Sequence, residues 1–262
     1  MAPMTVQRVA LGLAAATVLA QISYPLTHGS VRDVVTVLVV TLFAAACLAH
    51  ATAAYGPRWA VGFFVVTAGI GCGAELLGTA TGFPFGTYRY ADRLGLHIGE
   101  VPAVVPLAWT AGIYTVWSVA SILVQRKIFR VLAVAVGAVG WDVYLDPQMV
   151  ADGRWTWLST HPGLPGLDHI PWTNYLGWFL VALVMGICIE LLRGRRNIEV
   201  SHTVPVVLYI WTWLGSALAH AVFLDAPELR WSALYGLAAM SLLGVPLVRR
   251  GVADVSLRTR HG

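Results

Sequence analysis

Long runs of apolar residues without a charged side chain constrain this chain more than any other feature. A helix needs about 20 apolar residues to cross the hydrocarbon core of a membrane, and six uncharged runs reach about that length. Two further runs carry isolated charges: Glu75 in one, Arg130 and Asp142 in the other. The sequence therefore predicts eight transmembrane helices, near residues 9–27, 34–54, 59–78, 102–124, 128–145, 172–191, 203–224 and 231–248.

The composition argues against a water-soluble fold. Of the 262 residues, 58% are hydrophobic and only 11% are charged, whereas soluble domains carry about 25% charged residues. In water such a chain would expose large apolar patches and aggregate. We therefore expect an all-α, polytopic integral membrane bundle that forms a single domain over residues 1–262 in the cell membrane. No basic stripe interleaved with aromatic residues points to nucleic acid as a partner.

The distribution of basic residues predicts the orientation, because Lys and Arg are enriched in cytoplasmic loops. With eight spans, twelve of the seventeen Lys and Arg residues fall on the side of both termini, among them Arg193, Arg195 and Arg196. We therefore expect both termini to be cytoplasmic. The first run follows Arg8 and lacks a small-residue cleavage site at its end, so we expect an uncleaved span there.

Two long loops, near residues 79–100 and 146–170, are predicted on the opposite, outer side. Ten of the thirteen acidic residues lie in or beside the outer loops. Long loops in a compact bundle usually carry function. Any chemistry is therefore expected at this boundary of the membrane.

Glu75 lies near the outer end of the third span, in a segment that also holds Gly69, Gly71, Gly73 and Gly78. The glycines predict close packing against a neighbouring helix. A carboxylate at membrane depth is costly unless it is paired, hydrated or protonated. Glu75 is therefore either a headgroup-level or arginine-paired residue, or part of a functional site.

The segment after Glu75 is rich in aromatic residues and holds Phe83, Phe85, Tyr88, Arg89 and Tyr90. One interpretation is the aromatic belt that membrane proteins place at the interface. The other is a lid or mouth that admits an elongated apolar substrate from the lipid. In that case Arg89 could pair with Glu75, Asp92 or Glu100.

Asp142 and Asp146 are four residues apart at the end of the fifth span, so they share one face of a helix. Two close carboxylates cannot both ionise cheaply. A neutral carboxylic acid beside a carboxylate suits general acid–base catalysis. Pro147 disfavours helix at Asp146, so we expect the helix to end there. The alternative is a structural polar network at the helix end.

Asn174 lies near the start of the sixth span, where it either caps the helix or holds a water or a substrate hydroxyl. His97, His161 and His169 lie in the outer loops without the spacing of metal ligands, so we expect no metal site. No nucleotide-binding or catalytic-serine fingerprint occurs in a suitable context, and we expect no cofactor.

The order and spacing of these segments resemble the membrane carotenoid-biosynthesis family, which includes carotenoid 1,2-hydratases and bisanhydrobacterioruberin hydratases. The resemblance covers about residues 60–195. It rests on Glu75 and on the segments 83–90 (FPFGTYRY), 105–109 (VPLAW), 141–147 (WDVYLDP) and 174–178 (NYLGW).

This resemblance implies hydration of the terminal double bond of an acyclic carotenoid ψ-end to a tertiary alcohol, without a cofactor. A proton must reach the less substituted carbon, and water must reach the tertiary carbocation. The candidate catalytic residues are Glu75, Asp142 and Asp146. The candidate substrate-binding residues, which include aromatic faces that could stabilise a cation, are Phe83, Phe85, Tyr88, Arg89, Tyr90, Trp109, Trp141, Tyr144, Asn174 and Trp178. Carotenoid, water and membrane lipid are the expected partners, and contact with other carotenoid-pathway enzymes stays open.

Two other kinds of function stay open. A cyclase or isomerase that works through a carbocation would use the same acids and aromatic residues, and only hydration would add water to the product. A transporter or a carotenoid-binding scaffold is the non-enzymatic alternative. Transporters often place ionisable residues near the midplane on broken helices, whereas most spans here are uncharged in the middle.

Overall fold

A computed structural model describes residues 3–159, 161–192, 194, 197 and 199–260, with side chains described only between residues 4 and 252. The chain is mainly helical, and eight of its helical segments are long and apolar enough to cross a membrane. This number confirms the eight predicted spans. Arg193, Arg195 and Arg196, which contributed to the predicted orientation, lie outside the described residues.

Seven of the spans each consist of one uninterrupted α-helix. They are α1 (Pro3–Ser23), α2 (Gly29–Tyr55), α3 (Pro57–Thr81), α4 (Val105–Leu123), α5 (Lys127–Ala151), α6 (Trp172–Leu191) and α9 (Leu229–Arg260). The remaining span is composite and consists of α7 (Thr203–Ile210), the π-helical turn η2 (Trp211–Gly215), α8 (Ser216–Leu218) and the π-helical turn η3 (Ala219–Phe223). A 3₁₀ turn, η1 (Tyr24–Leu26), follows α1.

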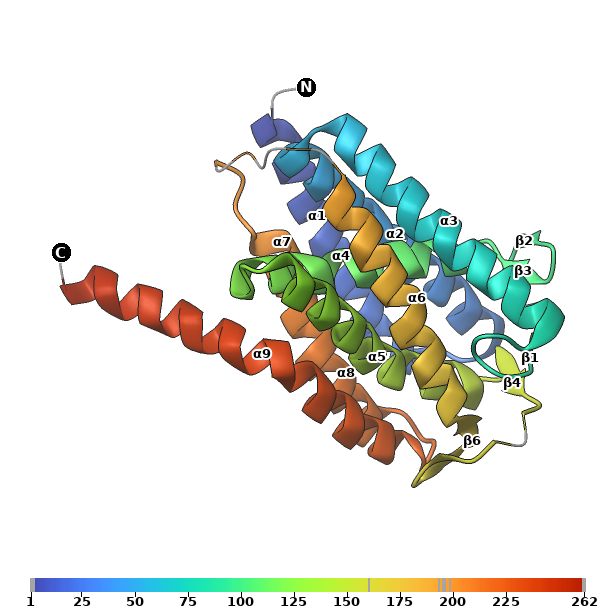
Figure 1. Ribbon diagram of the computed structural model, residues 1–262. Coiled ribbons are helices and arrows are strands. Elements are labelled where there is room, and N and C mark those ends of the chain that lie inside the picture. Colours follow the sequence, from blue (N-terminus) through green and yellow to red (C-terminus); the bar gives the residue numbers. More distant parts are fainter. Residues whose placement is uncertain (1–2, 160, 193, 195–196, 198, 261–262) are drawn as a thin grey trace.

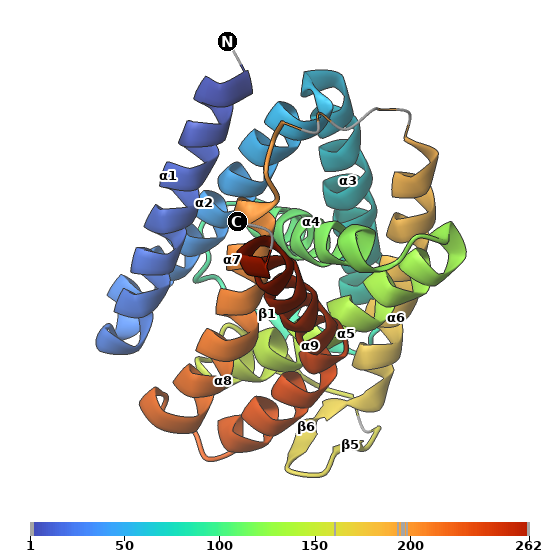
Figure 2. The same ribbon diagram turned by 90° about the vertical axis from the view of Figure 1, so that its left-hand side faces the viewer.

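Helix α4 is the centre of the bundle. It packs against α2, α3, α5, α7 and α9, and Figure 2 shows it surrounded by the other helices. Of its span, 83% is buried, against 50% or less in each of the other spans. A helix satisfies its own backbone polar groups, so α4 can be enclosed by apolar neighbours and can present side chains to several of them.

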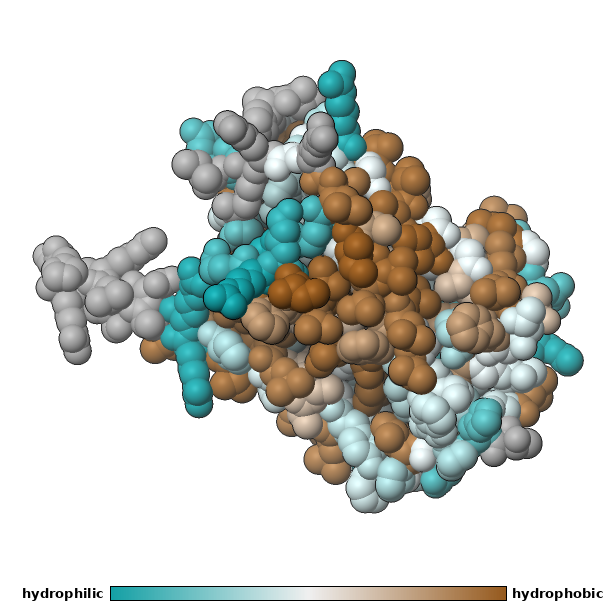
Figure 3. Space-filling view, viewed as in Figure 1, coloured by the Kyte–Doolittle hydropathy of each residue, from teal (hydrophilic) through white to brown (hydrophobic). Residues whose placement is uncertain are grey.

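Most of the exposed side chains in the middle of the bundle are apolar. Figure 3 shows hydrophobic residues across the middle of one face and hydrophilic residues toward its two ends. In water this surface would be unfavourable, but in a membrane it faces lipid. The surface therefore agrees with the membrane location that the composition indicates.

The two long loops gather at one end of the bundle, where they form three two-stranded antiparallel sheets (Figure 1). These pair β1 (Tyr88–Tyr90) with β4 (Trp155–Trp157), β2 (His97–Ile98) with β3 (Val101–Pro102), and β5 (Gly163–Leu164) with β6 (Leu167–Pro171). The all-α expectation therefore holds for the spans but not for these loops. The β1–β4 pair joins one long loop to the other, and we call it the cap sheet.

The predicted end of the fifth helix is wrong. Helix α5 continues through Pro147 to Ala151. Proline has no N–H, so the carbonyl of Val143 loses its helical partner. The Ser232 hydroxyl of α9 donates to that carbonyl at 2.6 Å and replaces the missing bond. The predicted start of the fourth helix at residue 102 is early by contrast, because Val101 and Pro102 pair in β3 and the helix begins at Val105.

Candidate active site

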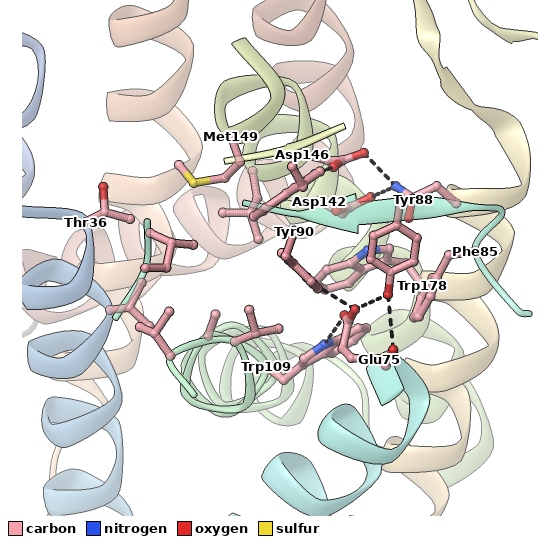
Figure 4. A pocket seen from close by; sticks show the side chains of 18 of the residues that line it. Thr36, Glu75, Phe85, Tyr88, Tyr90, Trp109, Asp142, Asp146, Met149 and Trp178 are labelled. Carbon is pink, nitrogen blue, oxygen red and sulfur yellow. Dashed lines mark hydrogen bonds between the residues drawn. The ribbon is translucent and has the colours of Figure 1, made fainter. Parts of the chain in front are cut away.

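A cavity lies at the cap end of the bundle, between the cap sheet and helices α2 to α6 (Figure 4). The carboxyl groups of Glu75, Asp142 and Asp146 all line it. Each of these three residues is at most 4% exposed. The cavity has room for a few water molecules. The three candidate acids therefore lie together on one cavity.

Glu75 on α3 is held by three neutral donors. The Tyr88 and Tyr90 hydroxyls both donate to Oε2, at 2.5 and 2.8 Å. The Trp109 indole N–H of α4 donates to Oε1 at 3.0 Å. Three donors around one carboxyl group suit the ionised form.

Asp142 and Asp146 face the cavity from successive turns of α5, and Asn174 of α6 bridges them. The Asn174 amide donates to Oδ2 of Asp142 at 2.8 Å and to Oδ2 of Asp146 at 3.1 Å. Asp146 also accepts the indole N–H groups of Trp155 and of Trp157, the latter at 3.0 Å. Asp142 accepts only the Asn174 bond among the hydrogen bonds of the described residues. Asn174 is therefore a bridge between two acids, and the N-cap position of α6 is taken by Pro171.

The cap sheet supplies four of these donors because its side chains alternate. Successive residues of a strand point to opposite faces. In β1, Tyr88 and Tyr90 point toward the acids, and in β4 Trp155 and Trp157 do the same. The rings of each cross-strand pair are in contact. Tyr88 and Trp157 are tilted, with centroids 4.9 Å apart, and Tyr90 and Trp155 meet edge to face, with centroids 5.4 Å apart.

Both cap tyrosines keep their protons. Burial, followed by the negative charge of Glu75, raises the pKa of Tyr88 and of Tyr90 well above its ordinary value. The two phenols are therefore donors throughout the ordinary pH range, and neither is a general base there.

Aromatic rings form one wall of the cavity. The Trp109 and Trp178 rings are stacked with centroids 3.6 Å apart, and Phe85 lies buried beside them on the lining. Gly71 makes room for this wall, since a Cβ there would lie 2.7 Å from Cγ of Trp109. Gly78 likewise leaves room for Tyr88 and Phe85. These two glycines therefore accommodate rings, whereas Gly69 and Gly73 face open space.

Arg89 and Phe83 lie away from the cavity. Arg89 alternates with Tyr88 and Tyr90, so its side chain is exposed on the other face of the cap sheet. It forms none of the ion pairs of the described residues, and the suggested pair with Glu75 is absent among them. Phe83 is 64% exposed at the turn after α3.

Tyr144 and Trp141 also lie off the cavity lining. Tyr144 is two residues from each aspartate, so it points to the opposite side of α5. Its hydroxyl donates to the carbonyl of Trp213 at 3.0 Å. Trp141 stands edge-on to Trp178, with centroids 5.9 Å apart, and reaches the site only through that ring.

Several lining residues were not among the sequence candidates. Trp155 and Trp157 are the most important of these, and the alternating pattern Trp-Thr-Trp could have placed both on one face of a strand. Thr36 of α2 lines the side of the cavity away from the acids (Figure 4), and Val40 of α2 and Met149 of α5 also line the cavity. No sequence signal singles them out, because such residues are ordinary in a membrane span.

Within the described parts of the chain, no Lys, Arg or His forms an ion pair with a cavity acid, that is, with Glu75, Asp142 or Asp146. The same parts hold no group of three or more His, Cys, Asp or Glu side chains arranged to bind a metal ion. The site can therefore hold and pass protons between carboxyl groups whose charges no arginine or lysine fixes.

Fold and site together define a polytopic helical membrane protein with a buried carboxyl cluster beside an aromatic wall. The chain belongs to the carotenoid biosynthesis protein family, which it matches over residues 35–243. It is 30% identical to the bisanhydrobacterioruberin hydratase of Haloarcula japonica over 113 residues, which are 41% of this chain and 37% of that protein. The alignment thus spans well under two thirds of the relative. No solved structure matches the chain.

Proposed function

We propose that the protein hydrates the terminal carbon–carbon double bond of an acyclic carotenoid ψ-end and releases a tertiary alcohol. One observation carries the proposal: three buried carboxyl groups surround one cavity inside a membrane bundle, and their hydrogen-bond donors among the described residues are neutral. Membership of the carotenoid biosynthesis family supports a carotenoid as the substrate. The hydratase name of the partial relative supports hydration.

Asp142 is the proposed general acid. Hydrogen bonds from neutral donors stabilise a carboxylate, and Asp142 receives one such bond where Asp146 and Glu75 each receive three. It is therefore the acid best suited to hold a proton. Transfer of that proton to the less substituted alkene carbon forms the new C–H bond and leaves a tertiary carbocation.

The carbocation then needs stabilisation and a water. The stacked Trp109 and Trp178 rings offer an aromatic face, which attracts a cation, and the Glu75 carboxylate offers a negative charge. A cavity water forms the C–O bond and gives a proton to the Asp146 carboxylate. Asp142 and Asp146 are one helical turn apart and share Asn174. Transfer of a proton from Asp146 to Asp142 restores the starting state, so the net change is the addition of one water.

Expression in a host that makes lycopene or γ-carotene tests the proposal. Each hydrated pigment should be heavier by one water and should carry a new hydroxyl group. Substitution Asp142→Asn should leave unhydrated carotenoid, while a membrane-inserted, folded protein is still made. Pigments of unchanged mass but altered absorption would instead indicate cyclisation or isomerisation. A pigment profile that the protein does not change would contradict an enzymatic role.

A further inference from the structure

We infer that Arg154 is a positioning residue that, through a cluster of ion pairs, holds the cap sheet against the cavity carboxyl groups. The inference deepens the proposed function, on which its activity measurements rest. We call this group of ion pairs the cap ion cluster. Its members are Arg32, Asp33, Arg93, Asp152 and Arg154.

The cap sheet needs an anchor. It has only three residue pairs, and a two-stranded sheet alone is at best marginally stable. Four of the donors to the cavity carboxyls nevertheless come from it. A small displacement of the sheet would move all four donors together, so whatever fixes the sheet also fixes the hydrogen bonds of Glu75 and Asp146.

The cap ion cluster ties both strands of the sheet to the first turn of α2. Asp33 forms one ion pair with Arg93, at 3.1 Å, and another with Arg154, also at 3.1 Å. Asp152 pairs with Arg154 at 2.8 Å and with Arg32 at 2.8 Å. Arg93 follows β1, while Asp152 and Arg154 precede β4. Each aspartate is thus shared by two arginines that come from different segments.

Arg154 is the member that joins the cluster to the sheet. It is 0% exposed and immediately precedes Trp155 of β4. Its carbonyl accepts the N–H of Ala91 at 2.8 Å, and its own N–H donates to the carbonyl of Met149 at 2.9 Å. The backbone of Arg154 therefore continues the sheet, while its guanidinium group spans two aspartates. A lysine has no planar fork and cannot hold both carboxylates in this way.

The first experiment compares wild type with Arg154→Lys in purified membranes that convert the carotenoid. Because the guanidinium group lies outside the cavity lining, we expect kcat to fall by about 10²-fold, the scale of a displacement of about 1 Å. KM should change little. The matched control is Arg130→Lys, which alters another largely buried ion pair, with Glu190, at the opposite end of the bundle. It should leave kcat unchanged.

A double-mutant cycle separates positioning from a general loss of folding. If Arg154 acts through the cap donors, Arg154→Lys should cost less activity in a protein that already carries Trp155→Phe and Trp157→Phe than it does in wild type, because two of the four donors are already absent. An equal loss of kcat in both backgrounds would overturn the inference.

Hydrogen exchange of the cap tests the inference without any activity. Amides in residues 86–93 and 153–159 should exchange faster in Arg154→Lys than in wild type, and Arg130→Lys should leave them unchanged. If Arg154→Lys does not fold, the milder Asp152→Asn should give the same local result. Unchanged exchange in the folded variant would refute positioning, even if carotenoid hydration is confirmed. Faster exchange without any carotenoid conversion by wild type would refute the proposed function and support positioning.

Discussion

Glu75 and Glu190 lie near opposite ends of the bundle, and helix α4 donates an indole N–H to each of them. Trp109 donates to Glu75 at 3.0 Å and Trp117 donates to Glu190 at 3.3 Å. The remaining partners differ. Glu190 receives a two-pronged ion pair from Arg130, at 2.5 and 2.7 Å, whereas the other partners of Glu75 are two phenols.

The difference cannot be explained by a shortage of arginines near the cap. Arg32, Arg93 and Arg154 all lie at that end, and each pairs with Asp33 or Asp152. An arginine beside a carboxylate fixes its negative charge. Neutral donors leave the proton of a carboxyl group exchangeable. The cap end therefore holds two kinds of acid. Asp33 and Asp152 pair with arginines, whereas none of the ion pairs of the described residues includes a cavity acid.

The largest expected effect is that of Asp142→Asn, which removes the proposed acid but keeps the shape and the bond to Asn174. We expect hydration to fall by about 10²- to 10⁴-fold, the usual contribution of a general acid. The rate of conversion in membranes with equal amounts of folded protein measures the effect. Near-normal activity would show that the acids without basic partners do not differ in function from the paired ones.

A smaller loss is expected from Asn174→Ala, which removes the bridge between Asp142 and Asp146. Both acids would remain but would lose their shared orientation, so we expect a fall in kcat of about 10²-fold. Asn174→Asp provides a sharper comparison, since it keeps the size of the side chain but offers oxygen where the two acids need a donor. If the activity of Asn174→Asp equals that of wild type, the bridge has no role in positioning the acids.

The sequence predicted the spans and the acids better than the surroundings of the acids. A charge in an apolar run stands out, so the sequence pattern alone identifies Glu75 and Asp142 as candidates. Trp155 and Trp157 do not stand out as site residues in the sequence, because a tryptophan in a membrane-boundary loop commonly lies at the lipid–water interface. Pairing in the cap sheet joins residues far apart in the chain, and local sequence patterns do not specify it.

The course of α5 shows the same limit. The rule that proline ends a helix failed at Pro147, because Ser232, far along the chain, supplies the hydrogen bond that proline cannot make. The side of α5 that Tyr144 faces follows from helical periodicity once α5 is known to be regular there. The predicted helix already contained Tyr144, so the periodicity that places Asp142 and Asp146 on one face also predicts Tyr144 on the other.

A moderate effect is expected from Gly71→Ala on α3. The new methyl group would lie 2.7 Å from Cγ of Trp109 and would push the ring away from Glu75 and Trp178. We expect activity to fall by up to about 10²-fold. Gly73→Ala, two residues along the same helix, meets nothing within 4 Å and should leave activity unchanged. If the two substitutions changed activity equally, the position of the Trp109 ring would not matter for the reaction.

The smallest effect on activity is expected from Glu190→Gln, which gives the glutamate opposite the cap a neutral side chain. The substitution leaves Arg130 without its ion-pair partner in a largely buried place, so it should destabilise the fold by up to about 3 kcal/mol. Thermal unfolding in detergent should detect this loss, while the turnover of the folded protein stays at the wild-type rate. Glu75→Gln should show the reverse pattern: it keeps a hydrogen-bonding group among neutral donors but removes the charge proposed to stabilise the carbocation. If both glutamine variants lowered stability alone, the charge of Glu75 would have no role in the reaction, and the acids paired with arginine would not differ in function from Glu75.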